Sequence, residues 1–310
     1  MSARVSIRAG QRNPERYTDA PLDTVDLADA RAKWAAARVE FGLKPTTPEL
    51  MRPGHENSKL AKNPAATYGL SLAPHSSGGV GTVCPWAGDC KDPCLASAGR
   101  GKFAAVQLGR QVRTYYAARW PMEFRAMLRH EIRNAAKRHG SNPVYLRLNV
   151  LSDIHYHEEP WAAVGNLPDT CLPYGYTKDP RRATMANAEQ VGHVLTYSVN
   201  ERDRTPDSIA DLLQEGHRAA VVLAHGEPWP VHPLIELVDG DAHDLRGNDP
   251  AGSIAVLRAK GKAKALQPAA DGSSRPGVRH DRNRCAVDAG PRRRVPHHCR
   301  RALMVGKLVT

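Results

Sequence analysis

The region after residue 140 alternates between short apolar segments and polar or helical segments. Strand-like segments occur at residues 144–149, 172–176, 193–198, 219–224, 234–238 and 253–257, after an earlier one at 67–73. The segment 219–224 is continuously apolar, which is typical of a strand buried on both faces. Strands that alternate with helices and loops indicate a parallel sheet. The sequence therefore predicts an α/β fold built as a partial or complete parallel α/β barrel.

Two helical regions precede these strands. Apolar residues recur at helical spacing between residues 26 and 41, and Gly42 follows as a cap. Residues 102–139 are also helical in pattern, and Pro121 divides them into two helices because proline suits a first turn but not a helix interior. The pattern predicts three parts, an N-terminal helical lead-in over residues 1–54, an α/β domain over 55–265 and a tail over 266–310.

The net charge of the chain resides mostly in that tail. The formal charge is +12, but residues 260–310 contain 13 Lys and Arg against 3 Asp and Glu, which leaves +2 for residues 1–259. The tail also lacks aromatic residues and apolar periodicity, so we expect it to be disordered. It could bind nucleic acid weakly and non-specifically through phosphates, or it could be a solvated tail without a dedicated role. A frame-shifted read-through of a GC-rich gene is a further hypothesis for its origin.

Cellular location follows from what the sequence lacks. No apolar run is long enough to span a bilayer, and the N-terminus has no secretory signal pattern. We therefore expect a cytoplasmic protein that does not enter a membrane. Cysteines in that compartment are more often free, metal-bound or catalytic than paired in disulfides.

Three cysteines lie within eleven residues, in the loop after the first expected strand. Cys84, Cys90 and Cys94 have the spacing C-x5-C-x3-C, interrupted by glycine and prolines that let the loop turn back on itself. Thiolates bind zinc and iron–sulfur clusters. Three thiolates suit a [4Fe-4S] cluster with one iron open, whereas a zinc site needs a fourth ligand such as His75, Asp89 or Asp92. The remaining interpretation is a set of loop thiols without a metal.

Other polar residues follow the expected strands. In a parallel sheet the carboxyl ends of the strands meet at one edge, where active sites lie. Asn149, Ser152 and Asp153 follow the strand at 144–149 and are candidates for binding a cofactor there. Two weaker groups could hold a metal ion for a hydrolase or nuclease, although aspartate–glycine runs usually form turns. These groups are His155 with His157, and Asp239 with Asp241 and Asp244.

Several segments together resemble a phage family known as the gene product eighty-eight domain. The resemblance covers about residues 55–265 and includes the cysteine loop. It also includes 57–62, 68–74, 94–101, 147–149 with 152–153, 176–178, 238–246 and 257–261. The resemblance implies a phage or prophage protein in a bacterial cytoplasm, and it implies no particular activity.

The cysteine loop is also similar to that of radical S-adenosylmethionine enzymes. These carry three cysteines after the first strand of a partial α/β barrel, with the usual spacing C-x3-C-x2-C, and S-adenosylmethionine chelates their open iron. The resemblance implies a [4Fe-4S] cluster on Cys84, Cys90 and Cys94. It also implies contacts from Asn149, Ser152 and Asp153 to the methionine or ribose, and an unknown small-molecule or nucleotide substrate.

Three functions therefore stand as hypotheses. The first is a radical S-adenosylmethionine-like enzyme. The second is a zinc-stabilised, non-enzymatic nucleic-acid-binding phage protein, whose affinity comes from the basic tail. The third is a metal-dependent hydrolase or nuclease that uses the histidine pair or the aspartate group.

Overall fold

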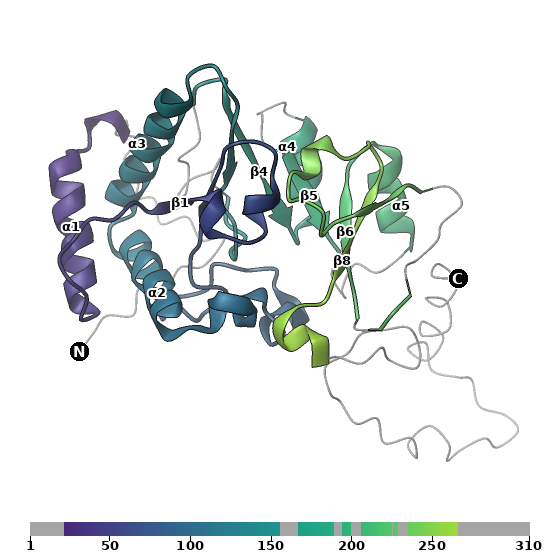
Figure 1. Cartoon of the computed structure of the whole chain (residues 1–310), viewed down its shortest axis with the longest axis horizontal. Coiled ribbons are helices and arrows are strands. Elements are labelled where there is room, and N and C mark those ends of the chain that lie inside the picture. The colour runs from purple at the N-terminus through teal and green to yellow at the C-terminus, as the bar shows by residue number, and fades with distance from the viewer. Residues whose placement is uncertain are drawn as a thin grey trace, which may run out of the picture.

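The fold is built on one eight-stranded sheet (Figure 1). The computed structural model describes residues 22–155, 167–188, 194–199, 206–224, 226–228 and 235–265. The strand order is β1-β2-β3-β4-β5-β6-β8-β7, with β1 antiparallel to β2 and every other pair parallel. The strands are β1 (Met51–Pro53), β2 (Thr67–Leu70), β3 (Val144–Arg147), β4 (Cys171–Thr177), β5 (Val194–Ser198), β6 (Ala219–Leu223), β7 (Leu237–Asp239) and β8 (Ile254–Arg258).

The described residues form five α-helices besides the sheet, and none of these is long and apolar enough to cross a membrane. They are α1 (Leu27–Glu40), α2 (Ala104–Arg119), α3 (Pro121–His139), α4 (Pro180–Ala188) and α5 (Pro206–Gln214). The helices expected at 26–41 and 102–139 are confirmed. Asp26 caps α1 through its side chain, Pro121 begins α3, and Gly42 and Gly140 follow α1 and α3 with positive φ.

The helices that flank the sheet pack on one of its faces. Sequential parallel strands joined by right-handed crossovers place their helices on the same side. One apolar cluster joins Leu70, Val144 and Leu146 of the sheet to α2 and α3. A second cluster joins Tyr197 of β5 and Ala219 of β6 to α4 and α5. We call this helix-covered side the outer face.

Two irregular segments cover the inner face. Residues 54–63, between β1 and β2, approach β2 so closely that a Cβ at Gly69 would lie 2.7 Å from Leu60 Cδ1. Residues 240–249, after β7, include the 3-10 turn η7 (Arg246–Asn248), which packs against β4 and β5. These two segments therefore cover the inner face of the sheet.

A buried ion network joins these two segments to the sheet. The Asp244 carboxylate accepts from Lys59 Nζ at 2.8 Å and from Arg147 Nη1 at 2.6 Å. The hydroxyls of Tyr174 and Tyr176 also donate to it, at 3.2 and 3.4 Å. Burial alone would raise the pKa of Asp244, but Arg147 and Lys59 hold it below its ordinary value.

Several strand predictions need correction. The sheet is open rather than a closed barrel, because β1 adds to one edge and β7 forms the other. Strand β1 was not expected, since three residues are too few to show a pattern. The last two strands exchange places, with β8 between β6 and β7. Strand β6 is not buried on both faces, since Val222 is 56% exposed.

The proline in β4 does not weaken the strand. The first half of β4 pairs with β3 up to Pro173, and the second half pairs with β5 from Tyr174. The proline therefore lies where the pairing changes partner, at a position where a missing N–H is tolerated. The tail over 266–310, expected to be disordered, lies outside the described residues.

The segment that follows β8 packs against the cysteine loop. After β8, the 3-10 turn η8 (Gly261–Ala265) packs against the turn η5 (Leu95–Ser97), and Lys262 N donates to Ser97 Oγ at 3.2 Å. Figure 1 shows this contact between the yellow-green end of the chain and the blue loop. A Cβ at Gly261 would lie 2.8 Å from Ser97 Oγ and 3.0 Å from the Ala98 backbone.

One buried carboxyl anchors the N-terminal part to α3. Glu131 accepts hydrogen bonds from Leu50 N at 2.8 Å and from Met51 N at 2.9 Å. Burial raises the pKa of Glu131 to about 7, although the two N–H groups act in the opposite direction.

We expect the free energy of unfolding of the wild type to fall, relative to Glu131→Gln, as the pH rises from about 5 to about 8. The unfolded carboxyl has a pKa near 4.5, so the stabilisation by proton binding is complete below that pH and disappears through pH 7. The difference is on the order of 3 kcal/mol, measured by urea denaturation. Glu56→Gln, at an exposed carboxylate, is the control. Parallel pH profiles for wild type and Glu131→Gln would contradict the expectation.

The contact between η8 and the cysteine loop gives a second prediction. Gly261→Ala should destabilise the protein by about 2 kcal/mol, because it combines positive φ with a clash against the Ala98 backbone. Gly99→Ala is a matched control, since Gly99 also has positive φ (+50°) but no atom within 4 Å of an added Cβ. Chemical denaturation and limited proteolysis of the 95–103 segment would measure the difference. Equal losses in both variants would argue against a close contact.

Candidate metal centre

The three cysteines lie at the carboxyl edge of the sheet, in the loop that follows β2. This is the place that the sequence predicted for the loop. Cys84 begins its own turn, Cys90 lies in the 3-10 turn η4 (Gly88–Lys91), and Cys94 precedes η5. Burial raises the pKa of Cys84, and thiolate charges at Cys94 and Cys90 would raise it further. The loop therefore gathers the three thiols in one neighbourhood.

Cys84 is partly buried and forms two hydrogen bonds with the backbone. Its Sγ accepts from His75 N at 3.3 Å and donates to Leu151 O at 3.3 Å. Burial raises the pKa of Cys84 to about 12, and Asp153 adds to this effect. Without a metal, Cys84 is thus a protonated thiol at neutral pH, and a metal ion would have to displace its proton.

Cys94 has a similar environment but also a cation nearby. Burial raises its pKa, and the charge of Cys90 adds to this, while the Ala96 N–H and the Arg110 guanidinium lower it. Arg110 is thus placed to interact with a thiolate at Cys94.

The arrangement fits an iron–sulfur cluster in its ligand chemistry, but it is not a preformed metal site. Among the described residues, no group of three His, Cys, Asp or Glu side chains is close enough to hold a metal ion as it stands. The donor set itself is three soft sulfurs on one glycine- and proline-rich loop, and the hydrogen bonds of Cys84 go to backbone rather than to acidic side chains. The turns that carry Cys90 and Cys94 would have to rearrange to enclose a metal.

His75 is the strongest candidate for a fourth ligand. It has a positive φ of 41°, unusual for a residue other than glycine, and its carbonyl accepts from Val83 N at 3.0 Å. This bond and the one from His75 N to the Cys84 sulfur hold the backbone of His75 next to Cys84. Burial lowers the pKa of His75, which favours the neutral imidazole that metal ions bind.

The three predicted cofactor-binding residues lie together after β3, and all are buried. Asn149 Oδ1 accepts from Ser152 Oγ at 2.8 Å and from Ile154 N at 3.2 Å, and Asn149 Nδ2 donates to Ile154 O at 2.8 Å. Asp153 N donates to Val83 O at 2.8 Å. The loop after β3 is therefore locked into one shape and attached to the cysteine loop, which agrees with the expected placement but leaves the binding role a prediction.

Asp153 links this loop to the next strand. Its carboxylate pairs with Arg182 of α4 and accepts from Lys178 N at 2.9 Å and from Thr177 Oγ1 at 3.3 Å. The Arg182 and Asp153 side chains are at most one-tenth exposed. The role of Arg182 was not predicted, because a basic residue in a first helical turn carries no signal of burial.

The residues of the hydrolase hypothesis do not form one acidic group. Asp244 belongs to the buried ion network, whereas Asp241 pairs with Lys260 at 2.6 Å and accepts from Arg258 N at 3.0 Å. Asp239 Oδ1 accepts from Asp241 N at 2.8 Å, as in a turn. Lysine and arginine thus occupy the places where a divalent cation would bind. His157 lies outside the described residues, so the histidine pair cannot be placed.

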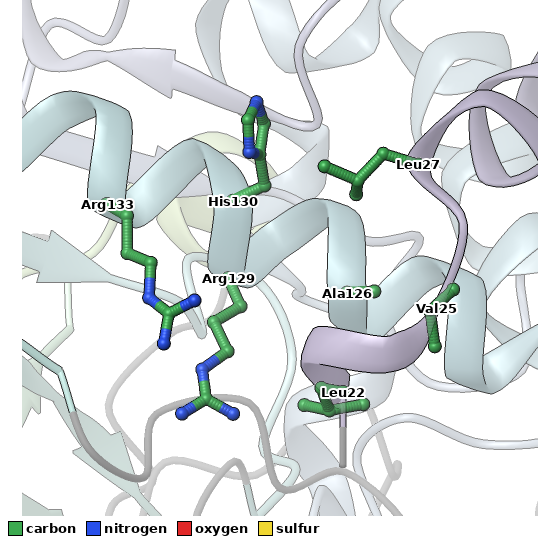
Figure 2. Close-up of a pocket in the computed structure, with 7 residues that line it drawn as sticks. All are labelled: Leu22, Val25, Leu27, Ala126, Arg129, His130 and Arg133. Atoms are coloured by element: carbon green, nitrogen blue, oxygen red, sulfur yellow. The ribbon is translucent and has the colours of Figure 1, made fainter. Parts of the chain in front are cut away.

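A pocket of about 230 Å³ lies elsewhere, between the turn η1 (Leu22–Thr24) and α3 (Figure 2). His130 on α3 faces it, and burial together with the nearby Arg31 lowers the pKa of that imidazole. None of the residues singled out in the sequence lines this pocket. Its lining comprises Leu22, Val25, Leu27, Ala126, Arg129, His130 and Arg133.

The fold and the site together define an α/β protein with an open, mostly parallel sheet and a three-cysteine loop at its carboxyl edge. A family model described as Gene product 88 matches residues 48–286. The chain belongs to this phage protein family, and the match extends beyond residue 265. No curated protein and no solved structure matches the chain, so the comparisons do not support the resemblance to radical S-adenosylmethionine enzymes.

The Asp153–Arg182 pair gives a prediction about the site. Asp153→Asn should destabilise the protein by about 3 kcal/mol, because it leaves a buried guanidinium without its carboxylate. Asp179→Asn is the matched control, since the partner of Asp179, Arg181, is 73% exposed and asparagine can still cap α4. The loss there should stay below about 1 kcal/mol. Equal stabilities of the two variants in urea denaturation would show that the buried pair contributes no more to stability than the exposed pair.

Proposed function

We propose that Cys84, Cys90 and Cys94 hold a [4Fe-4S] cluster and that the protein acts as a radical S-adenosylmethionine-like enzyme on an unidentified substrate. The observation that carries the proposal is the attachment of the loop after β3 to the cysteine loop. Asp153 N and the Leu151 carbonyl both bond to it, at Val83 and at Cys84. Residues expected to bind a cofactor thus lie beside the residues expected to bind the cluster.

The order of the strands also supports this proposal. Strands β2 to β6 follow one another in the sheet, the flanking helices lie on the outer face, and the cysteine loop follows the first parallel strand. A sheet that stays open at both edges is compatible with the partial form of the expected barrel. When bound, a cluster with one open iron would supply an electron for the reductive cleavage of S-adenosylmethionine.

The chain's own residues would divide the remaining tasks. Asn149 and Ser152 fix the shape of the loop after β3, so that its backbone N–H and C=O groups can orient an amino acid or a ribose. Asp153, neutralised by Arg182, keeps that loop attached to α4. Arg110 offsets the negative charge that three thiolates would bring to the loop.

A structural zinc ion is the second candidate. The observation that favours it is the position of His75, whose backbone bonds place it beside Cys84 and whose burial keeps the imidazole neutral. In that case the cysteine loop would be a structural element, and the protein would be a non-enzymatic binding protein.

Metal analysis separates these proposals. Protein purified without oxygen should contain about four irons per chain and absorb near 400 nm. Cys84→Ala should lose the iron and the colour. Cys171→Ala, at a buried cysteine in the apolar core of β4, is the matched control and should keep both. Circular dichroism establishes that each variant is folded.

The other outcomes are equally clear. A colourless protein with one zinc ion per chain that is lost in both Cys84→Ala and His75→Ala would replace the cluster by the zinc site. Wild-type protein that retains no metal after anaerobic reconstitution with iron and sulfide, and none with zinc, would reject both proposals.

A further inference from the structure

The short turns that follow Cys94 carry an exposed surface that the proposed cluster does not use. Leu95 in η5 and Phe103, just after the turn η6 (Gly99–Lys102), are 47% and 54% exposed. An exposed phenylalanine is unusual in a chain with three of them, because burying a large aromatic side chain is favourable. The Phe103 ring is therefore accessible to a binding partner.

Four exposed cations lie on the same turns or on the turn packed against them. Arg100 and Lys102 come from η6, and Lys262 and Lys264 come from η8, which packs against η5. The segments 95–104 and 258–265 contain no acidic residue. None of the four cations forms an ion pair with a carboxylate of the described part of the chain. We call Leu95, Arg100, Lys102, Phe103, Lys262 and Lys264 the basic–aromatic patch.

The turns that carry the patch are tightly fitted to one another. A Cβ at Gly101 would lie 2.6 Å from Ala96 O, so η6 folds directly onto η5. Gly261 meets Ser97 and Ala98 at the contact between η5 and η8. The cations and the ring are thus presented by a defined surface, although they come from segments about 160 residues apart in the sequence.

We propose that the basic–aromatic patch binds single-stranded nucleic acid. Positive side chains neutralise successive phosphates, and an exposed aromatic ring stacks on a base that is not paired. An anionic membrane surface would require a wider apolar face than one leucine and one phenylalanine on short 3-10 turns. The phosphates of a duplex would pair with the cations, but its paired bases would not stack on the Phe103 ring. The combination of charge and a single exposed ring therefore favours a single strand.

This proposal stands independently of the metal. The patch is formed by backbone and glycine contacts that do not involve the sulfurs. It also differs from binding by the basic tail, because the patch lies within residues 95–264 and includes an aromatic ring. Because Cys94 precedes η5 directly, a strand on the patch would lie beside the cysteine loop.

Fluorescence anisotropy with the full chain tests the proposal. The probes are a labelled 20-nucleotide oligothymidylate and a labelled 20-base-pair duplex. Phe103→Ala should weaken binding of the single strand about tenfold, because a stacked base is lost, and should leave duplex affinity unchanged. Lys262→Glu with Lys264→Glu should weaken binding of both probes and reduce the dependence of affinity on salt. Every variant keeps the arginine-rich residues 266–310.

Matched variants elsewhere serve as controls. Val39→Ala removes a side chain on α1 that is 54% exposed, and Lys44→Glu with Lys137→Glu makes the same charge change at exposed positions away from the patch. Both should leave the affinity for the single strand close to that of the wild type. Thermal unfolding establishes that all variants are folded.

Three results would overturn the proposal. One is wild-type affinity for the single strand in both Phe103→Ala and the double charge variant. Another is an equal loss in the control variants, which would assign the binding to overall charge. The third is loss of binding to phosphatidylserine vesicles in the patch variants without loss of binding to the oligonucleotide, which would identify a membrane-binding surface.

Discussion

The buried charge of Asp244 is the interaction on which the arrangement of the sheet depends. Lys59 precedes β2, Arg147 ends β3, and Asp244 follows β7, so one carboxylate connects three regions that are far apart in the sequence. Removing such charges from water is costly, and their attraction compensates only when the geometry is good and the remaining polar groups are satisfied. The hydroxyls of Tyr174 and Tyr176 donate further hydrogen bonds to the Asp244 carboxylate. The network thereby joins the two segments that cover the inner face to the sheet.

Because the inner face is filled, the carboxyl edge of the sheet is the place where we propose the site. The segments 54–63 and 240–249 occupy the inside of the curved sheet near β2 to β5, where a closed barrel would have layered apolar side chains. The loops that follow the parallel strands are left to form a surface. The cysteine loop runs along this edge from β2 to the end of β8, and it touches the loop after β3 and α4 on the way. Arg181 of α4, for example, lies over the Trp86 ring at 5.4 Å.

Local patterns in the sequence predicted the local features of the fold. Caps and apolar spacing placed α1, α2 and α3, and the strand-like segments placed β2 to β8 within a few residues. Long-range pairing was not predictable in this way. No local pattern distinguishes the order β6-β8-β7 from a sequential order, and β1 is too short to show a period. The burial of Arg147 was not predictable from the sequence either. An arginine at a strand end is usually solvated, and its partner Asp244 lies almost one hundred residues away in the sequence. The three cysteines and the loop 149–153 were found because both are short and continuous.

The anchors of the cysteine loop also bear on what a metal would do there. Hydrogen bonds attach the loop to the strand-end segments at Val83 and Ser97, and a tight backbone contact attaches it at Ala98. A metal that serves only to shape a loop is most valuable where other anchors are few, as in small zinc-stabilised domains. Here the loop has such anchors on both sides of its cysteines, and only the turns around Cys90 and Cys94 remain to be organised. If the loop holds a metal as we propose, this distribution favours a metal that contributes chemistry over one that contributes stability.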